Sequence, residues 1–300
     1  MGNKTAPIVI FVYKRVDKVK TLLESLNDAL FSELTDVFVY SDGFKNNNDR
    51  AAVEEVRDYL KSYKGKFRSF NIVYRDTNIG LARSIISGVS EVIDRSGRVI
   101  VLEDDLIVSE DFIQYMNDAL DYYEDDLRYG MISSYTTDHE CLKTYSRDIY
   151  CMERGDCWGW ATWKNRWEGI DWELNDFEDY LADRDRRRRF AGLQIGLEEQ
   201  LIMQHTGRLD AWAARWIFHL FNQHMLTVYP KVCRTINIGF DGSGTNCGYK
   251  SYDLSRLNKG TEKCRFEKLS ADYRIQRSQL DLSIRQLNVI KRIIYSFKYR

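Results

Sequence analysis

The chain has 300 residues, of which 44% are hydrophobic and 30% are charged, a composition typical of a folded protein with one large domain or two smaller ones. Its 44 basic and 45 acidic residues give a formal net charge of -1, which excludes the basic excess of a general nucleic-acid-binding protein. No stretch approaches the ~18 uninterrupted apolar residues of a membrane-spanning helix. The short apolar run near the N-terminus contains Pro7 and is followed at once by Lys14 and Arg15, unlike a secretory signal, so we expect a cytoplasmic protein.

The first third of the chain predicts alternating strands and helices. Continuous apolar runs indicate buried parallel strands, and apolar residues at helical spacing indicate the helices between them. The expected strands are residues 8–13, 37–40, 70–74 and 98–102, and the expected helices are residues 17–30, 51–63 and 78–93. This order predicts an α/β fold with a mostly parallel sheet covered by helices on both faces.

The rest of the chain is less regular. We expect helices over residues 111–125, 176–209 and 276–300, strands over 131–134 and within 227–238, and a loop over 240–249. Five tryptophans are clustered in one short segment, at positions 158, 160, 163, 167 and 172. Trp160, Trp163 and Trp167 are at helical spacing, which favours at least one in a core. The six cysteines form no CxxC pair and have no histidine at zinc-ligand spacing, so we expect reduced, mostly buried thiols.

Three consecutive carboxylates, Glu103, Asp104 and Asp105, directly follow the fourth expected strand. Ligands of such sheets bind at the carboxyl ends of the strands, where Arg15 and Asp42 are also expected. Neighbouring like charges repel unless a cation neutralises them, and Mg²⁺ or Mn²⁺ typically takes one or two carboxylates together with phosphate oxygens. The triplet therefore predicts a divalent metal site.

Around this triplet, the segment VIVLEDDLIVSEDF resembles the acidic motif of glycosyltransferases with the GT-A fold. It is especially similar to the EDD form of the N-acetylglucosaminyltransferase group and its bacterial relatives. The segments FVYKR, VYSDG, NIGLAR and the Gly-Trp pair at 159–160 resemble further family 2-like segments in order and spacing. The resemblance covers residues 6–240 and implies a Rossmann-like sheet with an irregular acceptor-side half.

The resemblance also implies roles for individual residues. Asp105 would bind the metal that bridges the donor phosphates, Asp104 would face the ribose, and Glu103 would face the donor sugar or ribose. Asp42 would accept a hydrogen bond from the uracil ring. Two arginines would lie near the nucleotide, Arg15 beside the base or diphosphate and Arg83 near phosphate, although Arg83 also fits an ordinary exposed helix position.

An inverting transferase needs one carboxylate as general base for the acceptor hydroxyl. Asp210, in LDAWAAR, resembles the base-bearing Asp-Trp pattern of the N-acetylglucosaminyltransferase group. Glu199, in the pair Glu198-Glu199, resembles a Glu-Asp pair of other family 2 enzymes and is the second candidate. Further carboxylates considered for this role are Asp156 and Asp171. Each of them also fits an ordinary surface position.

Sugar contacts and the remaining metal ligand are less well defined by the sequence. Flat aromatic faces stack on sugar rings, so Trp158 and Trp160 are candidate contacts to acceptor or donor sugar. No histidine follows position 224, so a further metal ligand would be water, Asp241 or Asn246.

Two basic segments have a choice of interpretations. Residues 183–189 contain five arginines, which fit either a solvated helix face or a contact with an anionic acceptor. Residues 285–300 carry five basic and no acidic residues around an apolar stripe. That stripe fits an amphipathic helix on an anionic membrane surface or one docked on its own domain.

We therefore expect a GT-A domain over residues 1–250, with a nucleotide-binding half (1–110) and an acceptor half (111–250), and a C-terminal extension over 251–300. The expected activity is metal-dependent, inverting transfer from a UDP-sugar to a glycan or lipid-linked glycan in bacterial surface polysaccharide synthesis. The enzyme would be cytoplasmic or peripheral on the inner membrane face. The alternatives are a sugar nucleotidyltransferase and a non-catalytic glycan-binding module.

Overall fold

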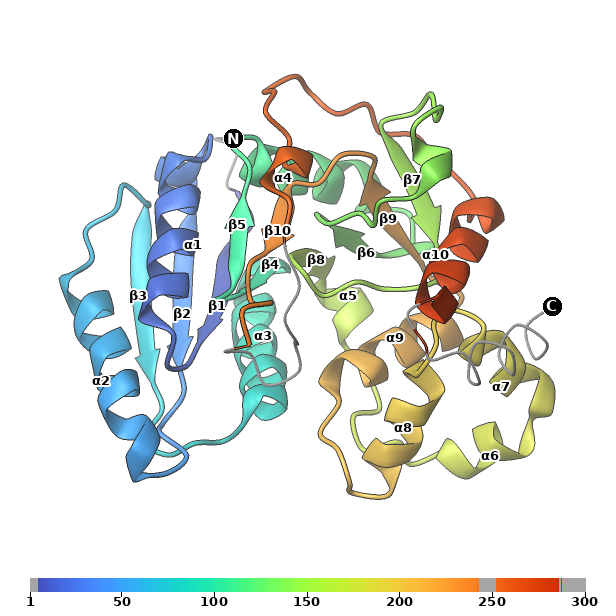
Figure 1. Cartoon of the computed structure of the whole chain (residues 1–300), viewed down its shortest axis with the longest axis horizontal. Helices are drawn as coiled ribbons and strands as arrows, with labels where there is room; N and C mark the ends of the chain where they lie inside the picture. The colour runs from blue at the N-terminus through green and yellow to red at the C-terminus, as the bar shows by residue number, and fades with distance from the viewer. Residues whose placement is uncertain (1–4, 243–251, 286, 288–300) are drawn as a thin grey trace.

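The computed structural model describes residues 5–242, 252–285 and 287. Eight strands form the central sheet in the order β3-β2-β1-β4-β8-β6-β9-β7, and two more form a separate ribbon, β10-β5 (Figure 1). The sheet strands are β1 (Ile8–Val12), β2 (Asp36–Ser41), β3 (Ser69–Tyr74), β4 (Arg98–Glu103), β6 (Tyr129–Ser133), β7 (Ile149–Met152), β8 (Trp160–Trp163) and β9 (Leu226–Pro230). The ribbon strands are β5 (Leu106–Val108) and β10 (Thr235–Asn237). The expected α/β fold class is confirmed.

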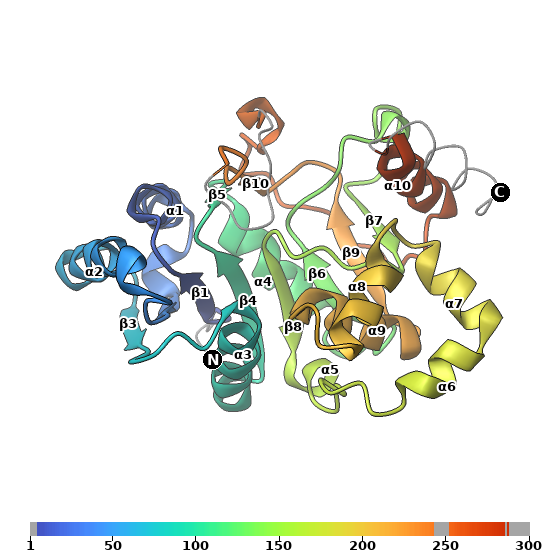
Figure 2. The same cartoon turned by 60° about the horizontal axis from the view of Figure 1, so that its bottom comes forward.

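Ten α-helices surround the sheet in the described part of the chain. They are α1 (Val16–Asp28), α2 (Asn47–Ser62), α3 (Leu81–Ser96), α4 (Phe112–Tyr123), α5 (Lys164–Trp167), α6 (Phe177–Ala182), α7 (Arg184–Ala191), α8 (Leu197–His205), α9 (Trp212–Asn222) and α10 (Tyr273–Arg285). Three 3₁₀ turns occupy Ser32–Leu34, Glu140–Leu142 and Leu254–Arg256. Figure 2 shows α1 and α3 on opposite sides of the sheet.

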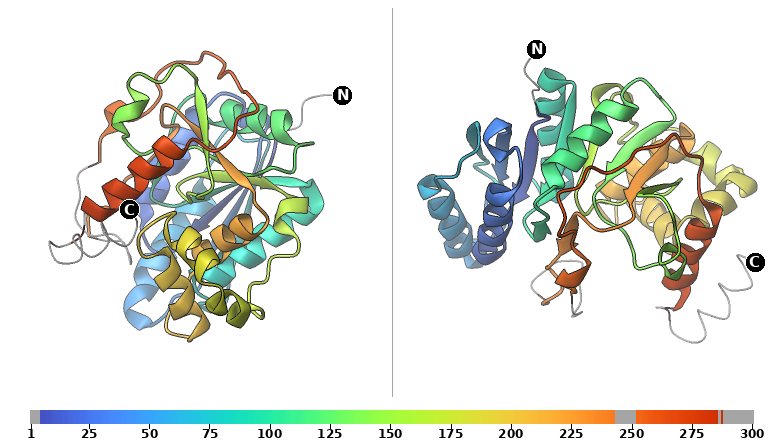
Figure 3. Two further views of the ribbon diagram at one scale, coloured as in Figure 1. Left: turned by 90° about the vertical axis from the view of Figure 1, so that its right-hand side faces the viewer. Right: turned by 90° about the horizontal axis from the view of Figure 1, so that it is seen from above.

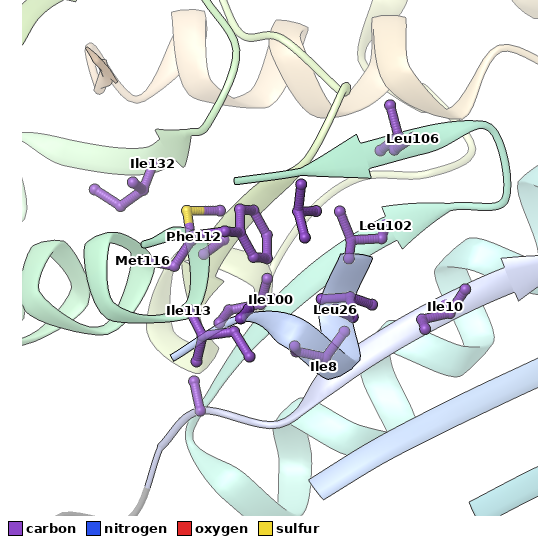
Figure 4. Close-up of a cluster of buried hydrophobic side chains, with 14 of the residues drawn as sticks. Ile8, Ile10, Leu26, Ile100, Leu102, Leu106, Phe112, Ile113, Met116 and Ile132 are labelled. Carbon is purple, nitrogen blue, oxygen red and sulfur yellow. The ribbon is translucent and has the colours of Figure 1, made fainter. Parts of the chain in front are cut away.

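Strand β1 is apolar throughout because helices bury both of its faces. On β1, Ile8 and Ile10 point into a core shared with α1, α2 and α4, whereas Val9 and Phe11 point into a second core shared with α3 and α9. Figure 4 shows the first core, where Leu26 of α1 lies close to the strand side chains. All four of these β1 side chains are at most 4% exposed, so the strand positions its carboxyl end rigidly.

The tryptophan-rich segment differs from its predicted helical spacing. Trp160 and Trp163 are the ends of strand β8, and only Trp167 lies in a helix, the single turn α5. Strand β8 runs antiparallel to both neighbours, with Trp160 opposite Val101 of β4 and Ser133 of β6. Long-range pairing on both edges therefore overrides the local helical pattern.

The helix predicted over residues 176–209 is also wrong as a single element, because it is three short helices, α6, α7 and α8. Asp183 ends α6 and caps α7, since its carboxylate accepts hydrogen bonds from the backbone N–H groups of Asp185 and Arg186. Gly196, with φ of 85°, precedes α8 in a left-handed conformation that glycine adopts most readily. The three helices and α9 enclose a separate apolar cluster around Tyr180 and Phe218.

The described C-terminal residues pack on the rest of the protein. The Tyr123 hydroxyl donates to the Glu267 carbonyl at 2.6 Å, and the Tyr129 hydroxyl donates to the Leu269 carbonyl at 2.9 Å. Helix α10 then contacts β7, as Figure 3 shows from two sides. The predicted amphipathic helix over residues 285–300 lies almost wholly outside the described residues, and the predicted domain division stays a prediction.

Two further predictions concern thiols and membranes. The described cysteines, at positions 141, 151, 157, 233 and 264, are free thiols, as expected, and Cys247 lies outside the described residues. Within the described ranges, no helix combines the length and the apolar character that crossing a membrane requires.

The contact between α10 and the preceding sheet region contains a buried histidine. His139 is 1% exposed, and its Nδ1 lies 3.1 Å from the Ser278 hydroxyl of α10. Its Nε2 is buried with no hydrogen-bond partner among the described residues. Burial, reinforced by Arg154 and Arg256 and opposed by Asp138, lowers the pKa of His139 from 6.5 to about 4.

We predict that this histidine makes the folded protein less stable in acid. The unfolded state binds the proton more readily, so the stabilisation is complete above pH 6.5 and is lost as pH falls toward 4. The free energy of unfolding should therefore drop by about 2 kcal/mol between pH 7 and pH 5 from this group. Urea unfolding of His139→Gln should show a correspondingly smaller drop, and His205→Gln is the control. An unchanged pH dependence in His139→Gln would contradict the assignment.

Candidate active site

The candidate site lies where β1, β2 and β4 end side by side. Phe11 of β1 is in register with Glu103 of β4, and Val12 of β1 is in register with Ser41 of β2. Asp42 follows β2 directly, Arg15 lies three residues after the end of β1, and the acidic triplet begins with Glu103, the last residue of β4. The parallel register therefore brings together the polar residues that the sequence placed at this edge.

Arg15 joins two of the three carboxylates. Its Nη2 forms an ion pair with Asp104 and another, at 3.0 Å, with Asp105 Oδ2. Asp104 and Asp105 are buried, at 4% and 8% exposure, and an uncompensated charge there would be costly. One guanidinium thus neutralises part of the charge of the acidic turn.

Proton affinities in the acidic turn reflect burial and mutual repulsion. Burial, followed by the charges of Asp105 and Asp104, raises the pKa of Glu103 to about 8. Burial also raises the pKa of Asp104 to about 6, although Arg15 opposes it. Both carboxyls therefore hold a proton more readily than a free side chain does, and a cation bound in the turn would favour their charged forms.

A segment far away in the sequence completes the surroundings of Asp105. Strand β10 pairs antiparallel with β5, which places Asn237 opposite Leu106 and its Nδ2 3.4 Å from Asp105 Oδ1. At Gly239, an added Cβ would lie only 2.1 Å from Asp105 Oδ2. Asn237 and Gly239 are not predictable from the sequence, because no local motif indicates a pairing between segments so far apart in the chain.

The segment that follows β10 is tied to helix α1. The Lys18 ammonium donates to the Ile238 carbonyl at 2.9 Å and forms an ion pair with Asp241 at 2.6 Å. Asp241, a candidate metal ligand, is therefore near the acidic turn but engaged by a lysine. Asn246, the other candidate, lies outside the described residues.

The donor set of the acidic turn fits a hard divalent cation. In the described part of the chain, no group of three histidine, cysteine, aspartate or glutamate side chains is arranged to hold a metal. Mg²⁺ and Mn²⁺ sites at phosphates usually need only one or two protein carboxylates, however, with phosphate oxygens and water supplying the rest. A side chain at position 239 would fill the space next to the Asp105 carboxylate. Glycine at this position therefore leaves room beside a carboxylate oxygen that can act as a metal ligand.

Asp42 is buried at the end of β2 and fixes the turn before α3. Its carboxylate accepts hydrogen bonds from the backbone N–H groups of Gly43, Ile79 and Gly80 at 2.9, 3.0 and 3.1 Å. Arg83 is an exposed residue in the first turn of α3, which begins at this same edge of the sheet. Asp42 thus shapes the loop between β3 and α3 whatever else it contacts.

The two tryptophans predicted to contact sugars lie on different sides of the sheet. Trp158 is half-buried beside the ribbon, edge-on to Phe240 at 5.5 Å, and its carbonyl accepts from the Thr235 hydroxyl at 2.6 Å. Trp160 is 1% exposed and packs between Trp167 and Trp212 in the core under α3 and α9. The structure thus brings Trp158 toward Asp105, whereas Trp160 is a core residue in this conformation.

Asp210 lies just before α9, near the same edge of the sheet. Trp212 of α9 stacks on Trp160 at 5.7 Å, and Trp160 is opposite Val101, two residues before Glu103. The Asp210 carboxylate is 54% exposed and accepts from Arg215 Nη2 at 2.7 Å. It combines solvent access with a fixed cationic partner.

The other base candidates are placed differently. Glu199 is half-buried in the first turn of α8, and its neighbour Glu198 is buried against Arg187 at 2.7 Å. The side chain of Gln204, near the far end of α8, accepts a hydrogen bond from the Ala211 backbone N–H. Glu199 lies about 8 Å from Gln204 along α8, so it is separated from the segment that holds Asp210.

The two remaining carboxylates have local structural partners. Asp156 is buried and forms an ion pair with Arg154 at 3.0 Å. Asp171 accepts hydrogen bonds from the backbone N–H groups of Glu173 and Asn175, so it stabilises its own turn.

Several solved structures are similar to this chain. S. aureus TarS 1–349 in complex with UDP-GlcNAc matches 43% of this chain and 33% of its own, at 15% identity and a TM-score of 0.31. The mannosyltransferase PcManGT from Pyrobaculum calidifontis, in complex with GDP-Man and Mn²⁺, matches 73% of this chain and 72% of its own, at 9% identity and a TM-score of 0.39. GalNAc-T7 with UDP, GalNAc and Mn²⁺ matches 77% of this chain and 43% of its own, at 11% identity and a TM-score of 0.46.

The matched region spans only 21% to 41% of the TarS chains. Comparison with curated proteins finds no match. The model of the family described as "Glycosyl transferase family 2" matches residues 8–167, which include the first four strands, the acidic turn and β8. Because this match covers more than half of the chain, the protein belongs to glycosyl transferase family 2.

Proposed function

We propose that this family 2 glycosyltransferase is metal-dependent and inverting, and that it transfers a sugar from a UDP-sugar to a glycan or lipid-linked glycan. The observation that carries this proposal is the acidic turn at the end of β4, where Arg15 forms ion pairs with both Asp104 and Asp105 at the carboxyl edge of the sheet. An anionic turn next to a fixed cation suits a ligand that brings both a divalent ion and a diphosphate.

In this proposal, each residue at the carboxyl edge of the sheet contacts a different part of the UDP-sugar donor. Asp105 would hold Mn²⁺ or Mg²⁺, which when bound stabilises the charge that develops on the leaving diphosphate. Arg15 would contact the base or the diphosphate, and its Nη1, buried with no hydrogen-bond partner among the described residues, has a donor to offer. Asp104 and Glu103 would face the ribose and the sugar.

The acceptor hydroxyl must lose its proton as it attacks the anomeric carbon. We assign this step to Asp210, whose carboxylate is exposed enough to meet an acceptor. The new bond forms from the acceptor oxygen to the anomeric carbon while the bond from that carbon to the phosphate oxygen breaks. Asp210 takes the proton, and UDP leaves with the electron pair.

The biological setting belongs to the proposal as well. An acceptor used in bacterial surface polysaccharide synthesis would be reached at the cytoplasmic face of the membrane. Trp158, beside the ribbon that flanks Asp105, is the aromatic side chain that we expect to stack on a sugar.

The first test of the metal site is removal of its ligand. Asp105→Asn should weaken Mn²⁺ binding, and Mn²⁺-dependent UDP binding, by at least about tenfold, because a neutral amide replaces a charged oxygen ligand. Titration calorimetry with Mn²⁺ alone and with UDP measures both. Asp58→Asn, which removes an exposed carboxylate, is the matched control. Equal Mn²⁺ affinity in Asp105→Asn and the native protein would refute the metal assignment.

The second test concerns stereochemistry. A single displacement with one base inverts the anomeric centre, so an α-linked UDP-sugar should give a β-linked product. The anomeric coupling constant of the product in proton NMR reports the linkage. An α-linked product would show that the reaction retains configuration, and the one-base scheme would then fail.

The third test separates the two base candidates. Asp210→Asn preserves the shape but removes the proton acceptor, so kcat should fall by at least about 10²-fold with little change in donor affinity. Glu199→Gln, which makes the same chemical change on α8, should retain turnover. If Glu199→Gln loses turnover while Asp210→Asn keeps it, the base lies on α8.

A further inference from the structure

A cavity of about 500 Å³ lies away from the acidic turn, between α7, the end of α9 and α10. Its polar lining includes Arg188 and Arg189 of α7, Arg277 and Tyr273 of α10, His224 and Glu153. These residues come from four separate parts of the sequence. The volume is in the usual range for a site that holds a small molecule or a group of a larger one.

The cavity carries an excess of positive charge. The lining includes three exposed arginines and a single carboxylate, that of Glu153, which lies 3.4 Å from the Gln276 amide nitrogen. Arg277 also forms an ion pair with Asp281 at 3.1 Å, and both side chains of this pair are exposed. Like charges that converge on one cavity repel, and an anion inside the cavity would relieve that repulsion.

Four of the five arginines of α7 fall into two groups. Arg186 donates to the Asn222 side chain at 2.7 Å, and Arg187 pairs with the buried Glu198, so both hold the helix in place. Arg188 and Arg189 line the cavity instead, with Arg189 also over the Phe221 ring. The arginine run is therefore part structural and part cavity lining, which a uniformly solvated helix face would not be.

The charge of the cavity also restricts what enters it. Residues 286–300 contain four basic and no acidic side chains, so their charge does not complement three arginines. An external oxyanion does, because guanidinium groups bind phosphate and carboxylate through paired N–H donors.

The position of the cavity favours the acceptor as the source of this anion. Phe221 and His224 at the end of α9 line it, whereas Asp210 lies just before the start of the same helix. The 11 residues of α9 separate the two by about 16 Å. The donor phosphates are assigned to the acidic turn. The anion in the cavity would therefore belong to a part of the acceptor that is distant from the reacting hydroxyl.

We propose that this cavity binds a phosphate or carboxylate group of the acceptor, and this proposal rests on the proposed glycosyltransferase function. Arg188, Arg189 and Arg277 supply the charge, and the aromatic rings of Tyr273 and His224 line the walls. The natural acceptor would then be an acidic glycan or a phosphorylated one.

The test is binding of inorganic pyrophosphate to the full chain in buffer with EDTA, so that no divalent ion loads the acidic turn. The variants are Arg188→Gln/Arg189→Gln and Arg277→Gln, and the matched control is Arg184→Gln, an exposed arginine of the same helix outside the cavity lining. Each cavity variant should bind pyrophosphate at least about tenfold more weakly, and the control should bind within about twofold of the native protein. Thermal unfolding of all variants checks that each is folded.

Three results would overturn the proposal: native affinity in the cavity variants, an equal loss in Arg184→Gln, or no pyrophosphate binding by the native protein. Phosphatidylglycerol vesicles separate a membrane surface from a cavity ligand. If the cavity arginines govern vesicle binding but not pyrophosphate binding, the proposal is wrong. Titration with UDP and Mn²⁺ distinguishes the two proposals. If the native protein binds pyrophosphate in EDTA but does not bind UDP with Mn²⁺, the anion site in the cavity is supported and the assignment of the donor site is refuted.

Discussion

The ion pairs between Arg15 and the two aspartates constrain the rest of the site. Asp104 and Asp105 are buried at a strand end, where two unneutralised carboxylates would destabilise the fold. Their neutralisation depends on the parallel register of β1 and β4, because Arg15 follows one strand and the carboxylates follow the other. The candidate active site and the stability of the sheet therefore depend on the same register.

Strand β8 runs antiparallel to β4, and this change of direction determines where the residues around β8 lie. Because β8 is antiparallel to β4, its first residue lies at the edge where β4 ends. Residues two apart in a regular strand share a face, but Trp158 precedes β8 and Gly159, with φ of 83°, interrupts the extended backbone between them. Trp160 therefore lies in the core while Trp158 lies on the ribbon side. One face carries the aromatic layer that supports α9 and Asp210, while the other carries the ribbon that encloses Asp105.

The parts predicted correctly from sequence are those determined by local patterns. The buried strands β1, β2 and β4 have continuous apolar runs, and the residues that follow them fall at one edge by the geometry of parallel sheets. The helical spacing of the tryptophans is misleading at Trp160, because the partners of its strand lie in β4 and β6, outside the tryptophan-rich segment. The contact of Gly239 with Asp105 depends on pairing of β10 with β5, and no periodicity encodes such a pairing.

The near-zero net charge of the chain conceals a separation of charge in space. The acidic turn concentrates carboxylates where a donor would bring a cation, whereas α7 and α10 concentrate arginines around a cavity elsewhere. The net charge of the whole chain excludes a general polyanion-binding protein, but the opposite charges of these two regions cancel in that sum. Salt screens the buried carboxylates of the acidic turn weakly and the exposed arginines of the cavity more strongly, so each region acts on its own ligand over short distances. A transferase that moves a sugar from a metal-bound nucleotide diphosphate to an acidic acceptor, as we propose, needs this separation, because one shared basic surface would hold both substrates at the same place.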